Sequence, residues 1–141
     1  MSDNPPVNRY LKNTAFDHID HALGRPTWPL RESYRNYFAT GMDGAQAQAF
    51  SASPYWALSG VQGNMAYYHV TDAGRTALAA HLASPGSEWR PYLVTYRGFE
   101  RVVPAKSRSA ARYRYFSALR EVVPDLRFVD FAADARVRVA A

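Results

Sequence analysis

The segment from Lys106 to Arg114 brings together side chains that bind anions, because Lys106, Arg108, Arg112 and Arg114 lie within one short stretch. Arg108 and Arg112 are four residues apart, so a helix would place them on the same face. Guanidinium groups pair readily with phosphate or carboxylate, and the free N–H groups of a helix start also attract anions. The segment therefore predicts an anion-binding surface. A solvated basic face on an amphipathic helix is the alternative.

Two histidines, His18 and His21, are spaced for one face of a helix and are flanked by aspartates. A metal site needs at least three ligands, so His69 or His81 would have to supply another from elsewhere in the chain. A polar helix face accounts for the same pattern without a metal. We therefore predict no metal site and no cofactor.

Catalytic motifs are missing from the sequence. There is no cysteine, no nucleophile elbow, no phosphate-binding loop and no dinucleotide fingerprint. Asp125, Asp130 and Asp134 could be sought as a carboxylate set of the kind a nuclease needs, but their spacing is not diagnostic, and surface carboxylates that balance Arg127, Arg136 and Arg138 explain them better. We predict that the protein is not an enzyme.

The positive charge is concentrated in the last third of the chain. Residues 1–96 hold seven basic and seven acidic side chains, whereas residues 97–141 hold ten basic and five acidic ones, which is the whole net charge of +5. Such asymmetry indicates an anionic partner, either nucleic acid or an acidic protein surface. The predicted nucleic-acid-binding residues are Arg97, Arg101, Lys106, Arg108, Arg112 and Arg114.

Apolar spacing, caps and turn residues predict the elements that position these side chains. Residues 1–13 are expected to be a flexible arm. Helices are predicted at 15–23, from Pro29 to just before Gly41, at 43–50 and at 72–82, with a β-hairpin of strands 55–58 and 65–70. After a break at 84–87, strands 92–96 and 99–103, a helix at 108–122, a short apolar segment at 126–131 and a last strand at 135–139 follow.

The predicted fold class is therefore α+β. A helical part (residues 14–83) is expected to pack with a small basic ββα(β) part (residues 88–141), either as separate domains or as one compact domain.

The stretch from His69 to Leu78, His-Val-Thr-Asp-Ala-Gly-Arg-Thr-Ala-Leu, resembles the end of the wing in winged-helix transcription regulators. In that family a β-hairpin leads into a threonine-capped helix, as Thr71 and Gly74 would allow here. The resemblance implies a winged-helix-like N-terminal part. Its recognition helix would be 43–50, which has no Arg or Lys, so contact with DNA is expected through the C-terminal third instead.

The chain also resembles small uncharacterised proteins of tailed phages and prophages, through Tyr34–Phe38, the Val-Thr-x-x-Gly-Arg element, Ala105–Arg112 and Phe128–Phe131. This resemblance implies an accessory or regulatory setting. We expect a non-catalytic phage or prophage protein that binds nucleic acid through its basic C-terminal third.

Two alternatives stay open. One is a protein–protein inhibitor of a host anti-phage defence complex, such as an anti-CRISPR, and the other is a virion assembly subunit. The aromatic side chains expected at a protein interface are Tyr55, Trp56, Tyr67 and Tyr68. A homodimer is also left open. The N-terminus has no secretory signal, and no apolar run approaches the roughly 18 residues that cross a bilayer. The expected location is the host cytoplasm.

Overall fold

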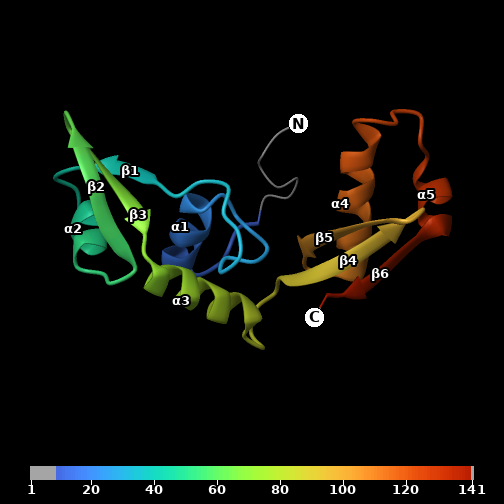
Figure 1. The fold of residues 1–141 in the computed structure, drawn as a ribbon, viewed down its shortest axis with the longest axis horizontal. Coiled ribbons are helices and arrows are strands. Elements are labelled where there is room, and N and C mark those ends of the chain that lie inside the picture. The colour runs from blue at the N-terminus through green and yellow to red at the C-terminus, as the bar shows by residue number, and fades with distance from the viewer. Residues whose placement is uncertain (1–8, 141) are drawn as a thin grey trace. The chain divides into compact units, whose positions relative to one another are not determined.

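The computed structural model describes residues 9–140, and within them the chain is an α+β protein, as predicted. These residues divide into two compact units: residues 10–81, which we name the N-terminal unit, and residues 82–140 together with Arg9, which we name the C-terminal unit. Each unit contains a three-stranded antiparallel sheet (Figure 1). Most of the predicted flexible arm, residues 1–8, lies outside the described residues.

The N-terminal unit is built around a cluster of aromatic rings on one face of its sheet, whose strand order is β1-β3-β2. Phe50 and Trp56 stack with ring centroids 4.0 Å apart, and Phe38 and Tyr68 meet Phe50 edge to face. Such pairs add to the stability that burial alone provides. The elements are α1 (Thr14–Ala22), β1 (Phe38–Gly41), α2 (Ala45–Ser51), β2 (Trp56–Gln62), β3 (Met65–Val70) and α3 (Asp72–Ala83).

The predicted helix from Pro29 to Gly41 is wrong, because this segment forms turns and then strand β1. Long-range side-chain bonds hold it instead of helical ones. The Asn36 amide donates to the carbonyl of Val70 (3.0 Å) and accepts from its N–H (2.7 Å). Arg75 of α3 donates to the carbonyl of Pro29 (3.2 Å). Of the apolar side chains in this segment, Leu30, Tyr34 and Tyr37 are exposed, whereas Phe38 is half-buried in the aromatic cluster.

The hairpin and the threonine-capped helix after it are present as expected. The Thr71 hydroxyl accepts from the N–H of Gly74 (3.2 Å) at the start of α3. A Cβ at Gly74 would lie 2.6 Å from Cγ1 of Val70 and 2.7 Å from the carbonyl oxygen of Tyr55. Only glycine therefore lets α3 approach the hairpin this closely.

The helices ahead of the hairpin differ from the prediction. Two of the three predicted helices, α1 and α2, are present in the described residues, and β1 lies between them. A helix-turn-helix needs two consecutive helices joined by a short turn. The described N-terminal unit therefore has a β-hairpin followed by a helix, without that helix pair.

The C-terminal unit has the predicted ββα(β) order, with one short helix added. The sheet order is β5-β4-β6, so both β5 and β6 are edge strands. Arg97 (φ 50°) and Gly98 (φ 85°) join β4 to β5 in a tight turn, as two-residue hairpin loops require. The elements are β4 (Arg90–Tyr96), β5 (Phe99–Ala105), α4 (Arg108–Arg120), α5 (Phe128–Asp134) and β6 (Ala135–Val139).

The two faces of this sheet have different roles. Tyr92, Val94 and Tyr96 of β4 are buried, and the ring of Tyr96 meets Phe131 of α5 with centroids 4.9 Å apart. That face is covered by helices. Opposite residues on antiparallel strands share a face, so Arg136 and Arg138, which pair with Thr95 and Leu93, belong to the other face.

Candidate anion-binding site

The predicted cations Lys106 and Arg114 lie over one aromatic ring at the junction of β5 and α4. The Nζ of Lys106 is 5.5 Å from the ring centroid of Trp89, and the guanidinium carbon of Arg114 is 5.4 Å from it. Lys106 also pairs with Glu88 (3.6 Å). Because Trp89 is buried beneath them, these two cations stabilise the strand–helix junction itself.

The predicted cations Arg97 and Arg101 lie on the β4–β5 hairpin, apart from one another. Arg97 donates to the carboxylate of Asp134 (3.3 Å) in an exposed ion pair. Arg101 is exposed on β5, opposite Val94, and makes no hydrogen bond or ion pair with the described residues. The six predicted residues therefore do not form one continuous site.

Helix α4 positions the two remaining cations. Ser107 is its N-cap, since the hydroxyl accepts from the N–H of Ala110 (3.0 Å). Arg108 and Arg112 then follow four residues apart, on the same helix face. Arg108 is exposed and unpaired within the described chain. Arg112 is half-buried, and its Nε is buried with no hydrogen-bond partner among the described residues. An unpaired buried donor is costly, so an acceptor supplied there would stabilise it.

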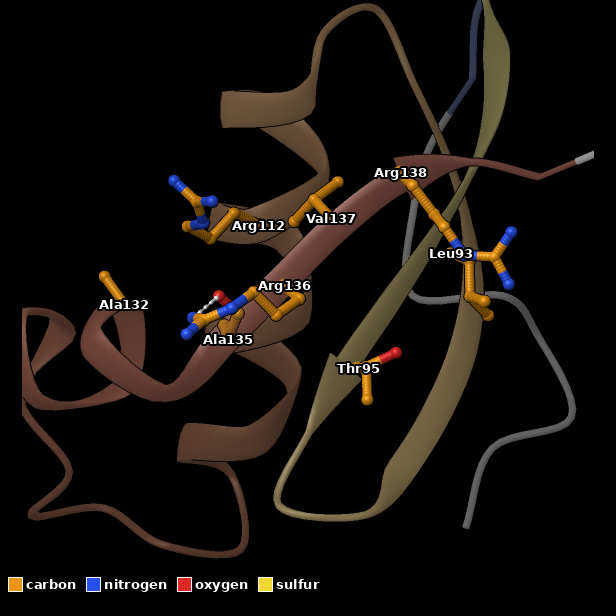
Figure 2. A pocket seen from close by; sticks show the side chains of 8 residues that line it. All are labelled: Leu93, Thr95, Arg112, Ala132, Ala135, Arg136, Val137 and Arg138. Atoms are coloured by element: carbon orange, nitrogen blue, oxygen red, sulfur yellow. Dashed lines mark hydrogen bonds between the residues drawn. The ribbon is translucent and has the colours of Figure 1, made fainter.

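A hollow of about 300 Å³ lies along β6, and we call it the β6 hollow. Arg112 and Ala132 approach it from the helices, whereas Arg138 points away from Arg112 toward Leu93, as Figure 2 shows. Three of its lining side chains are guanidinium groups and none is a carboxylate. The lining residues are Leu93, Thr95, Arg112, Ala132, Ala135, Arg136, Val137 and Arg138.

Arg136 and Arg138 are the site residues that the sequence analysis did not select. They lie outside the charge run at 106–114, and only the pairing of β6 with β4 brings them near Arg112. The alternation Arg136-Val137-Arg138 in a predicted strand was the available signal, because it places both cations on one face. Arg136 donates to the carbonyls of Ala135 (3.0 Å) and Ala133 (3.4 Å). Arg138 is exposed and makes no ion pair with the described residues.

The four aromatic residues expected at a protein interface lie on different faces of the N-terminal unit. Trp56 and Tyr68 are buried in the aromatic core, and the Tyr68 hydroxyl donates to the carbonyl of Ala47 (3.1 Å). Tyr67 is half-buried on the opposite face of the sheet, since neighbouring residues of a strand alternate. Tyr55 is half-buried just before β2. Trp56 and Tyr68 thus act as packing residues in this unit.

The histidines of α1 are surrounded by aromatic and basic groups. His18 meets Phe38 and Phe50 edge to face, and Arg35 donates to the backbone carbonyl of His21 (2.8 Å). Burial lowers the pKa of His21, and the charges of Arg35 and Arg25 lower it further. Within residues 9–140 no three His, Asp or Glu side chains are grouped as a metal site would need.

The three aspartates considered for catalysis are separate. Arg127 forms an exposed ion pair with Asp130 (2.9 Å), which raises the pKa of that arginine, and Asp134 pairs with Arg97. Asp125 is exposed in the loop after α4. None of the helices in the described part of the chain has the length and apolar character that crossing a bilayer requires.

Comparison with known proteins finds no family model, no curated protein and no solved structure that matches this chain.

Proposed function

We propose that this is a non-catalytic binding protein whose C-terminal unit binds nucleic acid through four arginines: Arg108, Arg112, Arg136 and Arg138. The observation that supports this most directly is the composition of the β6 hollow, which is lined by three arginines and by no carboxylate. Concentrated positive charge that is not neutralised within the fold attracts a polyanion. The proposal includes an accessory or regulatory role in a phage or prophage. It also includes a winged-helix-like N-terminal part.

Phosphate is the anionic group that these side chains suit best. Arg108 and Arg138 have no ion-pair partner within the described residues, so pairing with phosphate would break no existing salt bridge. Arginine donates two parallel N–H groups to phosphate oxygens. Contacts of this kind carry no sequence information, so the expected binding is independent of base sequence.

The test measures the affinity of the full chain for a random-sequence duplex as salt rises from about 50 to about 200 mM, where phosphate-driven binding weakens steeply. Arg108→Gln with Arg138→Gln removes two unpaired cations. Arg97→Gln with Arg127→Gln is the matched control, because it also removes two positive charges but takes arginines already paired with Asp134 and Asp130.

The first double variant should lower the affinity and reduce the slope of log affinity against log salt by about two. The control should change both much less. No binding at low salt would refute the proposal. An equal loss in both double variants would mean that net charge, and not this set of arginines, governs binding.

A further inference from the structure

We propose that the outer edge of β6 pairs with an extended, acidic segment of a partner protein, which adds a fourth strand to the sheet of the C-terminal unit. This inference goes beyond nucleic-acid binding, because it assigns the edge's backbone groups as well as its charges. It rests on which backbone groups point outward, on the contrast between the two edges and on the side chains beside β6.

The pairing of β4 with β6 fixes which backbone groups are outward. The N–H of Ala140 donates to the carbonyl of Pro91 (2.9 Å), directly opposite in the register. Hydrogen-bonded pairs recur at every second residue of an antiparallel ladder, so Arg138 and Arg136 direct their backbone groups toward β4. Val137 and Val139 therefore direct their N–H and C=O groups away from the sheet. The same alternation places the carbonyl of Ala135 outward. This carbonyl accepts from the Arg136 guanidinium and not from β4, as an outward group should.

The opposite edge of the sheet is closed by proline. With the same alternation, β5 directs the backbone groups of Glu100, Val102 and Pro104 outward. Pro104 has no N–H to offer, and a proline at this position is a common way to prevent strand addition. The outward positions of β6 carry no proline. Of the two edges, β6 is the one that can accept a strand along its length.

The side chains beside β6 specify an acidic partner strand. Arg136 and Arg138 would lie next to alternate residues of an added strand on the open face, and carboxylates there would pair with them. The residues between would face Val137, Ala132 and the aliphatic part of Arg112. A strand in which acidic and apolar residues alternate therefore fits.

A second copy of this chain fits poorly. Pairing β6 with β6 would bring Arg136 and Arg138 against the same arginines of the other copy, and like charges on adjacent strands are destabilising. A nucleic acid fits the edge itself poorly as well. Phosphates can accept from the outward N–H groups, but the outward carbonyls need donors, which a peptide backbone supplies at the same spacing.

The test uses the full chain and a blocked, fluorescent peptide of about eight residues in which glutamate and valine alternate, a typical strand length. Val137→Pro removes one outward N–H and leaves every charge in place. Val102→Pro, at an outward position of β5, is the matched control. Circular dichroism and thermal unfolding check that both variants remain folded.

Val137→Pro should weaken peptide binding about tenfold or more, and Val102→Pro should leave it unchanged. A peptide in which lysine replaces glutamate should bind far more weakly. In the unsubstituted chain, hydrogen exchange at Val137 and Val139 should slow when the acidic peptide is added, which is a readout that does not depend on how well the variants fold.

Unchanged binding by Val137→Pro, or no slowing of exchange at these amides, would overturn the inference. So would a concentration-dependent dimer in sedimentation that Val137→Pro abolishes, because a second copy would then occupy the edge. Suppose that the peptide does not bind, while the duplex binds the unsubstituted chain and loses affinity for the variant with Arg108→Gln and Arg138→Gln. The strand inference then fails and the proposed function stands. If the peptide alone binds, the proposed function fails and the strand inference stands.

Discussion

Arg25 and Arg75 of the N-terminal unit bond within the fold, whereas several arginines of the C-terminal unit form no ion pair within the described residues. Arg25 is buried and pairs with Asp17 (2.8 Å) and Asp20 (3.2 Å), and Arg75 binds the backbone of Pro29. In the C-terminal unit, Arg101, Arg108 and Arg138 are exposed, and within residues 9–140 they form no ion pairs. The charge of the residues is the same in both units, and the difference lies in the partners of their side chains. Arg25 and Arg75 therefore maintain the structure, whereas Arg108 and Arg138 can bind a partner without losing an ion pair.

The largest effect should come from the buried ion pair. Asp20→Ala removes a fully buried carboxylate and takes from the guanidinium of Arg25 one of its carboxylate partners, while the shorter contact to Asp17 remains. Removing one partner of a buried ion pair costs about 3–5 kcal/mol of stability. Urea unfolding should show this loss in the free energy of unfolding. A loss below about 1 kcal/mol would mean that Arg25 is not a structural residue, and the contrast between the units would weaken.

A smaller loss is expected from Gly74→Ala, although alanine is the better helix former. The added Cβ would meet Val70 and the carbonyl of Tyr55 at less than ordinary contact distance, so overpacking should cost about 1–3 kcal/mol. Gly86→Ala, where nothing lies within 4 Å, is the control and should be nearly neutral. Thermal unfolding of the two variants compares them. A gain of stability in Gly74→Ala would show that α3 can move away from the hairpin.

Acidification should destabilise the N-terminal unit in two steps. The pKa of His21 is lowered from 6.5, mainly by burial, so below pH 6.5 the unfolded chain binds a proton that the folded chain does not. Burial raises the pKa of Asp17, but the bonds from Arg25 and the N–H of Leu11 outweigh it and hold the pKa below 3.8. Stability should thus fall as pH drops below 6.5 and fall again below 3.8.

Thermal unfolding between pH 8 and pH 3 measures this dependence. His21 is exposed and Asp17 is only half-buried, so the changes should be modest. In His21→Gln the decline that starts near pH 6.5 should disappear, while the one below pH 3.8 remains. An unchanged profile in this variant would assign the first decline to another group.

The smallest effect on stability should come from the unpaired arginines. Arg108→Gln and Arg138→Gln remove exposed charges without partners among the described residues, so each should change the free energy of unfolding by less than about 0.5 kcal/mol. Chemical denaturation of each variant measures this. A loss comparable with that of Asp20→Ala would show that these arginines also maintain the fold, and the distinction between the two units would be lost.

Most helices and strands could be predicted from the sequence because the residues that determine them are close neighbours in the chain. The cap at Ser107, the Arg97-Gly98 turn and the alternation of β3 each act over a few residues. The segment after Pro29 was mispredicted because its structure depends on distant partners. Phe38 pairs with Tyr68, and Asn36 bonds to Val70, contacts that no window of neighbouring residues contains.

The candidate site also depends on contacts between residues that are far apart in the sequence. The sequence identified Arg108 and Arg112 from helical spacing, but it grouped them with Lys106 and Arg114, which lie over Trp89. Arg136 and Arg138 are more than twenty residues away from that run in the sequence. They line the same hollow as Arg112 only because β6 pairs with β4 in this register. That pairing requires β5, α4 and α5, which lie between the two strands in the sequence, to fold as well.

The proline on β5 also has a consequence for assembly size. A chain can polymerise through its sheets only when each copy presents two edges that accept strands, one to receive the previous copy and one to offer to the next. Because Pro104 lies at the outer edge of β5, a copy that accepts a strand at β6 has no second edge in this sheet at which a further copy could add. Assemblies formed through it should therefore have a fixed, small stoichiometry and should not grow into fibres.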